Sequence, residues 1–107
     1  MSSCIFCKII NKEMNSDIVY EDSKVLAFKD INPKAPFHVL IIPKKHIESV
    51  AHLKDSDKEI ISDLILTAKK IAQEKKLPGY KLAINVGREG GQIVDHLHLH
   101  LMANKSV

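Results

Sequence analysis

The sequence predicts an α+β fold, an antiparallel five-stranded sheet with one long helix and a short N-terminal helix. Three observations support this prediction. Short β-rich segments alternate with turn residues, and one long segment has apolar residues at helical spacing. The length of 107 residues, with 45% hydrophobic and 27% charged residues, suits one modest core. Residues 1–107 are therefore expected to form a single domain.

The N-terminal part of the chain supplies three of the strands. Residues 5–10 are mostly apolar and predict a short helix or an irregular turn. Asp17–Glu21 and Lys24–Asp30 predict a hairpin. A loop with two prolines follows, and then Phe37–Ile42 predicts a central strand, since it is apolar on both faces except at His38.

The one long helix is expected over Ser56–Lys76. Ser56 and Glu59 fit a capping box, in which Ser56 closes the end and Glu59 reaches back. Pro78-Gly79 would stop the helix at its other end. The apolar stripe at helical spacing comprises Ile60, Ile61, Leu64, Ile65, Ala68, Ile71 and Ala72. This stripe is assigned to the core and to no function.

Tyr80–Val86 and Ile93–Met102 predict the last two strands, and the second carries three histidines alternating with leucine. His96, His98 and His100 would share one strand face because side chains alternate, while the leucines between them share the buried face. Neighbouring imidazoles would lie about 6–7 Å apart. The alternative is a solvated polar face, a role to which histidine is poorly suited. Function is therefore the favoured interpretation of this row.

The other histidines are less informative alone. His38 is either a core histidine bonded to a backbone group or, if its strand pairs with the last one, a member of the histidine row. His46 follows a strand end and suits a surface position or metal ligation, and His52 is expected at the surface. The glycine-containing turn Gly87–Gln92 directly precedes the histidine strand. Glycine N–H groups can approach phosphate oxygens closely, so turn and imidazoles together suggest phosphoryl or nucleotidyl transfer with a histidine nucleophile.

Both cysteines lie in one Cys-x-x-Cys, Cys4 and Cys7. Half of a zinc site, a redox dithiol and a pair of small core residues all fit this spacing. Redox chemistry is the weaker option because only three residues precede the pair. Zinc would need two further ligands from elsewhere in the chain.

Charge and hydropathy exclude several classes of protein. The formal net charge is +3, and the lysine doublets are too short for a nucleic-acid tract. Mild basicity would help to attract an anionic substrate. The sequence has no apolar run as long as a membrane span and no signal-peptide pattern at its start. We expect a cytoplasmic protein that binds neither nucleic acid nor membrane.

These residues together resemble the histidine triad family. His96–Met102 matches the motif His-φ-His-φ-His-φ-φ, where φ is apolar. The segments that look like the Hint branch of the family are Asp30–Pro33, Ala35-Pro36, His38–Ile47, Gly90–Gln92 and, at the start, Cys4–Ile9. The resemblance covers almost the whole chain, and its combination of motifs is specific.

The resemblance implies a dimeric hydrolase of purine nucleoside phosphoramidates, of the adenosine monophosphoramidase type, that forms a nucleotidylated histidine. His98 would attack the α-phosphorus from an exposed position in a nucleotide-sized cleft, free of metal. His100 and His38 would bind the phosphate and leaving group or tune His98. Asn85 and the Gly91 backbone would contact the phosphate, and Asp30 would hold the ribose hydroxyls. The base pocket would be lined by Ile5, Phe6, Ile9, Phe28 and Ile31.

The resemblance also implies a structural zinc ion bound by Cys4, Cys7, His46 and His96, with no organic cofactor. At Ile93, in the nucleotide site, the Hint branch often has a hydroxyl or acidic residue, so a side-chain hydrogen bond to the leaving group would be lost here. Two alternatives remain open. One is a dinucleoside polyphosphate hydrolase of the Fhit-like branch, and the other is a nucleotide-binding interaction protein with little catalysis.

Overall fold

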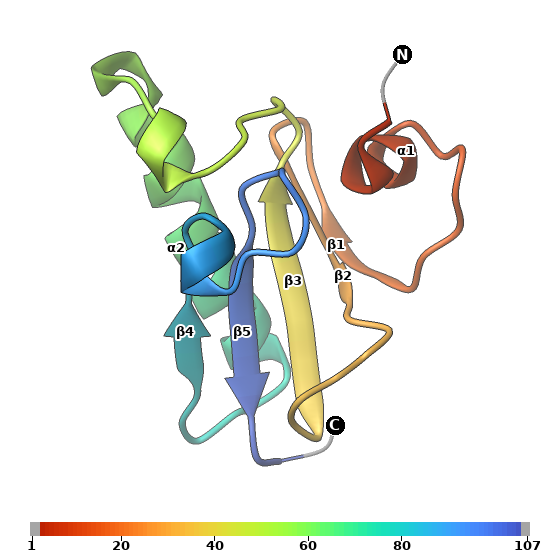
Figure 1. Ribbon diagram of the computed structural model, residues 1–107. Helices are drawn as coiled ribbons and strands as arrows, with labels where there is room; N and C mark the ends of the chain where they lie inside the picture. The colour runs from red at the N-terminus through yellow and green to blue at the C-terminus, as the bar shows by residue number, and fades with distance from the viewer. Residues whose placement is uncertain (1–2, 106–107) are drawn as a thin grey trace.

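The computed structural model describes residues 3–105 and contains the expected five-stranded antiparallel sheet (Figure 1). The strands are β1 (Ile18–Glu21), β2 (Val25–Lys29), β3 (Phe37–Pro43), β4 (Lys81–Ala83) and β5 (Leu99–Ala103), in the spatial order β1-β2-β3-β5-β4. The helical elements of these residues are α1 (Ile5–Ile10), α2 (Lys58–Glu74) and the 3-10 turns η1 (Val50–His52), η2 (Asp55–Asp57) and η3 (Arg88–Gly90). The predicted α+β class is confirmed.

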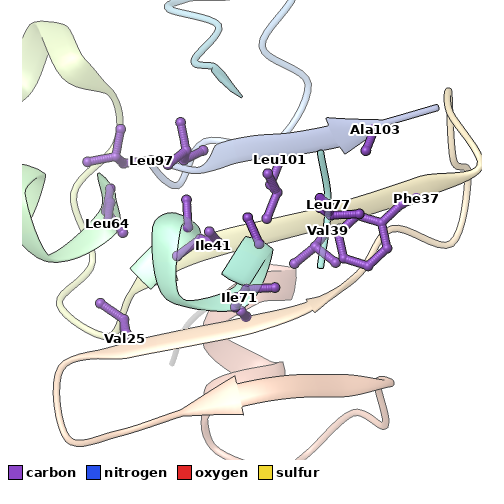
Figure 2. Close-up of a cluster of buried hydrophobic side chains, with 14 of the residues drawn as sticks. Val25, Phe37, Val39, Ile41, Leu64, Ile71, Leu77, Leu97, Leu101 and Ala103 are labelled. Atoms are coloured by element: carbon purple, nitrogen blue, oxygen red, sulfur yellow. The ribbon is translucent and has the colours of Figure 1, made fainter. Parts of the chain in front are cut away.

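Helix α2 covers one face of the sheet. Figure 2 shows Leu64 and Ile71 of α2 beside Val39, Ile41 and Leu101 of the central strands, and all five belong to one buried apolar cluster. Burial of each large side chain contributes about 1.5–3 kcal/mol. The apolar stripe predicted for the helix thus does form core at Leu64, Ala68, Ile71 and Ala72.

Helix α1 covers the opposite face and is packed more thinly. Phe6 and Ile9 of α1 lie against Leu26, Phe28, Leu40 and Ile42 in a second apolar cluster. Figure 1 shows the two helices on opposite sides of the sheet. Because strand side chains alternate, His38 of β3 and His100 of β5 point to the α1 face, while Val39 and Leu101 point to α2.

The last two strands are shorter than predicted. Strand β5 begins at Leu99, since the Leu97 N–H donates to Ile47 O at 2.7 Å and the His96 N–H to Val94 O at 2.9 Å, instead of pairing within the sheet. Strand β4 consequently pairs only over Lys81–Ala83. Hydrophobic alternation persists into the segment before β5, which is why the sequence pattern overestimated the strand.

The start of α2 also differs from the prediction. Ser56 lies inside η2, and α2 begins at Lys58. Asp57 takes the reaching-back role expected of Glu59, because its buried carboxylate accepts the Lys54 N–H at 3.0 Å. The same carboxylate accepts from Lys45 Nζ at 2.8 Å, which lowers the pKa of Asp57.

No helix within residues 3–105 combines the length and the apolar character needed to cross a membrane.

Candidate functional site

The three histidines of the row all lie on the α1 face. His100 belongs to β5, whereas His96 and His98 lie in the extended segment before it. The ring of Phe6 contacts His96 at 5.8 Å and His98 at 5.2 Å between centroids, and the His98 and His100 rings are 5.0 Å apart. The predicted alternation is therefore present, and the rings of His98 and His100 are closer together than the expected 6–7 Å.

Cys4, Cys7, His46 and His96 form a cluster of four potential metal ligands. Nδ1 of His96 lies 3.3 Å from Cys4 Sγ, 3.7 Å from Cys7 Sγ and 3.1 Å from His46 Nδ1. Bond lengths typical of tetrahedral zinc would place nitrogen and sulfur ligands about 3.3–3.8 Å from one another. Both sulfur–nitrogen distances lie in this range, and the nitrogen–nitrogen distance of 3.1 Å is slightly shorter. The four residues come from three distant parts of the chain, namely the N-terminus with α1, the segment after β3 and the segment before β5.

The protonation of His96 also suits metal ligation. Its Nε2 lies 2.9 Å from Pro43 O, and a carbonyl can only accept, so Nε2 carries the proton and Nδ1 keeps its lone pair. Burial lowers the pKa of His96 to about 4, which keeps the ring neutral at pH 7. Nδ1 of His46 lies only 3.1 Å from this lone pair, a separation that suits two nitrogens sharing one cation.

His98 is not one of the four clustered donors, but it is more buried than expected, with 7% exposure. The edge of Phe6 and the His100 ring cover it, so the prediction of an exposed imidazole was wrong. Its Nδ1–H donates to His96 O at 2.7 Å, which leaves the lone pair on Nε2. Nε2 has no hydrogen-bond partner within residues 3–105. Burial lowers the pKa of His98, so the ring is neutral and nucleophilic near pH 7.

His38 and His100 form a pair beside His98. Nε2 of His38 lies 2.9 Å from Nδ1 of His100 and 3.5 Å from Oδ2 of Asp30. In the sheet His38 is opposite Met102 and His100 opposite Leu40, so the two histidines are diagonal neighbours whose side chains can meet. His38 thus joins the histidine row, one of the two positions considered for it. Burial lowers the pKa of both, that of His100 to about 4.

The glycine-containing turn is held in place by Gln92, a residue to which the sequence assigned no role. The Gln92 side chain is 2% exposed, and its Oε1 accepts the Gly87 N–H at 2.8 Å. Its Nε2 donates to Glu48 O at 2.7 Å and to Val94 O at 2.9 Å. Glycine is required at Gly87 and Gly91, where φ is 73° and 92°. The turn is therefore fixed relative to the His46 and His96 segments.

The residues expected around a phosphate and its leaving group are only partly gathered. Asn85 Nδ2 donates to Gly91 O at 3.5 Å, so these two lie together. Ile93 is 82% exposed and makes no part of either core cluster. Next to it, Arg88 forms a two-point ion pair with Asp95, with N–O distances of 2.7 and 3.0 Å. A pocket of about 380 Å³ borders Ile93, Arg88 and Asp95.

Of the five residues predicted to line a base pocket, the structure gathers three. Phe6, Ile9 and Phe28 belong to the cluster under α1, with the two phenyl rings 5.4 Å apart. Ile5 is 39% exposed and Ile31 85% exposed, so both lie at the surface. Asp30, next to Ile31, is half-buried and faces His38 rather than open solvent.

Several known proteins resemble this chain in sequence and in fold. Residues 3–107 match the family model described as scavenger mRNA decapping enzyme C-term binding. The chain is 47% identical to Protein HitA of Neisseria gonorrhoeae over 103 residues, which is 95% of this chain and 96% of that protein. A HIT family hydrolase from Legionella pneumophila superposes with a TM-score of 0.93 at 46% identity, over 97% of this chain and 95% of that one.

A third relative is a histidine triad nucleotide-binding protein from Candida albicans. It has a TM-score of 0.83 and 41% identity, and the match covers 92% of this chain and 73% of that one. The chain belongs to the histidine triad (HIT) superfamily.

Acid is expected to destabilise the fold through His100. A histidine in an unfolded chain has a pKa of about 6.5, and burial lowers the pKa of His100 to about 4, so between these values the unfolded chain binds more protons than the folded one. The stability contribution of the neutral ring is present above pH 6.5 and is lost as pH falls towards about 4, at no more than about 1.4 kcal/mol per pH unit.

Urea unfolding near pH 7 and about pH 5 measures this loss, and His100→Asn should reduce it. His52→Asn is the matched control, because His52 is exposed. An equal loss in wild type and His100→Asn would contradict the assignment.

Proposed function

We propose that this protein is a hydrolase of nucleoside phosphoramidates in which Nε2 of His98 is the nucleophile. The observation that carries the proposal is the hydrogen bond from His98 Nδ1 to His96 O, since it puts the lone pair on the other nitrogen. The depressed pKa of His98 supports it further, because a protonated imidazole cannot attack phosphorus.

The reaction proceeds in two steps, transfer of the nucleotidyl group to His98 and hydrolysis. The His98 lone pair attacks the α-phosphorus, the P–N bond breaks, and the departing amine takes up a proton from solvent. Water then attacks the nucleotidylated imidazolium, the P–Nε2 bond breaks, and the nucleoside monophosphate leaves as one water proton returns to solvent. Nδ1 keeps its proton throughout, because His96 O accepts it at 2.7 Å and stabilises the charge on the modified ring.

The neighbouring residues bind the substrate. His100 and His38 contact the phosphate and the leaving group, and Asn85 with the Gly91 backbone cradles phosphate oxygens. Asp30 is assigned to the ribose hydroxyls, although its carboxylate also lies 3.5 Å from His38. Phe6, Ile9 and Phe28 provide an apolar surface that suits a purine, and Ile5 and Ile31 would complete it once a base is bound.

The Hint branch is favoured over the Fhit-like branch, whose members hydrolyse dinucleoside polyphosphates, because the cysteine pair and His46 meet His96 in one cluster. The exposed side chain of Ile93 cannot donate a hydrogen bond to a leaving group, which favours substrates with an apolar amine. The same feature supports the second candidate function, a nucleotide-binding protein with little catalysis. The relatives described as a hydrolase and as a nucleotide-binding protein fit both readings of the site.

His98→Ala is expected to lower release of nucleoside monophosphate from adenosine phosphoramidate by roughly 1000-fold or more, because no other group can replace the nucleophile. His52→Ala should keep the wild-type rate, since His52 is exposed and lies in η1. Equal rates for wild type and His98→Ala would rule out the enzyme. Retained nucleotide affinity in both would then support the binding protein.

We also propose that the cluster of Cys4, Cys7, His46 and His96 holds a structural zinc ion. Four protein ligands fill a tetrahedral shell, so bound zinc would cross-link the chain and take no part at phosphorus. His96 would be the connection between the two sites, because it offers Nδ1 to the ion and its carbonyl to His98.

Purified wild type should contain one zinc per chain by elemental analysis, and Cys4→Ser should lose zinc and melt at a lower temperature. Ser3→Ala is the control, because it changes the adjacent side chain without removing a donor of the cluster. A metal-free wild type whose melting temperature does not respond to added zinc would overturn the assignment.

A homodimer is proposed through the β4 edge of the sheet. Strand β4 has no neighbour on its outer side within the described residues, and Leu82 in the strand and Tyr80 directly before it are 37% and 43% exposed. Unpaired strand edges with apolar side chains favour pairing with another chain.

Leu82→Glu is expected to convert the dimer to monomer in sedimentation velocity, since a buried carboxylate would repel its symmetry mate. Ile18→Glu is the control at the opposite edge, where Ile18 of β1 is 40% exposed. A wild type that sediments as a monomer, or a dimer broken only by the β1 variant, would contradict this interface.

A further inference from the structure

The protons of the His38–His100 pair can be located from the hydrogen bonds around it. The backbone N–H of Lys34 donates to Nδ1 of His38 at 3.0 Å. A nitrogen that accepts a hydrogen bond carries no proton, so neutral His38 is protonated on Nε2. Both groups near Nε2 can accept that proton, His100 Nδ1 at 2.9 Å and Asp30 Oδ2 at 3.5 Å.

The proton of His100 can be located in the same way. Because Nδ1 of His100 accepts from His38, its own proton must be on Nε2. That Nε2 is enclosed, yet it has no hydrogen-bond partner within the described residues. An enclosed donor without an acceptor costs free energy, so such a group in a native fold requires an explanation, and a catalytic or binding role is one of them.

Hydrogen bonds within the loop before β3 orient the backbone N–H of Lys34. Asp30 Oδ1 accepts the Asn32 N–H at 2.9 Å, and the Asp30 N–H donates to His38 O at 3.0 Å. Pro33 restricts φ directly before Lys34. These contacts hold the turn of residues 30–34 against the start of β3, and the Lys34 N–H faces the His38 ring in consequence.

We propose that Lys34 is a positioning residue whose backbone N–H sets the tautomers of His38 and His100, so that His100 presents an N–H donor and not a lone pair to an anionic phosphate oxygen. The proposal rests on the proposed function for the identity of the acceptor. Burial keeps both rings neutral near pH 7, so each has one proton and its position decides what the ring can bind. His98 has the opposite tautomer, because the His96 carbonyl accepts from its Nδ1–H and Nε2 therefore carries no proton.

The test is nitrogen NMR of the histidine rings, which distinguishes Nδ1–H from Nε2–H tautomers without any turnover. Wild type should show both His38 and His100 as Nε2–H. Lys34→Pro removes the amide proton and should give mixed tautomers at both rings, while Lys34→Ala keeps that proton and should give the wild-type ring spectrum. An Nδ1–H tautomer at His100 in wild type, or unchanged tautomers in folded Lys34→Pro, would overturn the proposal.

Substitutions at His38 test the hydrogen bond from His38 to His100, and they do not depend on the folding of Lys34→Pro. His38→Gln can still donate to His100 Nδ1 and should preserve the Nε2–H tautomer. His38→Glu can only accept, and it should move the His100 proton to Nδ1. An Nε2–H tautomer at His100 in both variants would also overturn the proposal.

The affinity for adenosine monophosphate tests whether His100 donates to a phosphate oxygen. Loss of a hydrogen bond to a charged oxygen should weaken binding by roughly 10- to 100-fold in His38→Glu relative to His38→Gln. Equal affinities would show that His100 does not donate to phosphate. The ring spectra remain decisive if no phosphoramidate is hydrolysed, so failure of this proposal and failure of the proposed function are distinguishable.

Discussion

The geometry of the site depends on His96. Its Nε2–H donates to Pro43 O, its Nδ1 faces His46 and both cysteines, and its carbonyl accepts the Nδ1–H of His98. One residue therefore links the end of β3, the potential metal cluster and the proposed nucleophile. The first two contacts are linked, because the proton on Nε2 is what leaves Nδ1 available as a ligand.

The two faces of the sheet carry different side chains. The α2 face is a continuous apolar core, to which alternate residues of β2, β3 and β5 contribute. The α1 face holds the histidines, and it is covered by a helix of only six residues, whose Phe6 contacts His96 and His98. A short helix buries little apolar area, so any additional bond between α1 and the sheet would stabilise its packing. Cys4 and Cys7 lie at its start and within it, where a bound ion would provide that tie.

Backbone groups decide the protonation of the site. Carbonyl oxygens of Pro43 and His96 place protons on His96 Nε2 and His98 Nδ1, and the Lys34 amide leaves Nδ1 of His38 bare. Neighbouring histidines in one row thus acquire different roles, although the side chains are chemically identical. The low pKa that burial gives to His96 and His100 makes these tautomers matter, since protonated rings would all be donors alike.

The alternation of histidine and leucine was enough to predict which side chains share a face, because side-chain direction in extended backbone depends on local geometry alone. The helix stripe, the hairpin and the α+β class followed from the same local rules, and the family motif supplied the predicted positions of the metal ligands and of the nucleophile. The contacts of Gln92, the Lys34 amide and the burial of His98 under Phe6 could not be predicted, since each joins segments distant in sequence or uses main-chain atoms common to every residue. The ends of β4 and β5 belong to the same class, because Leu97 donates to Ile47 and not to a neighbouring strand. Sequence determined the chemical groups and the face on which they lie, and tertiary structure decided which nitrogen of each ring carries the proton.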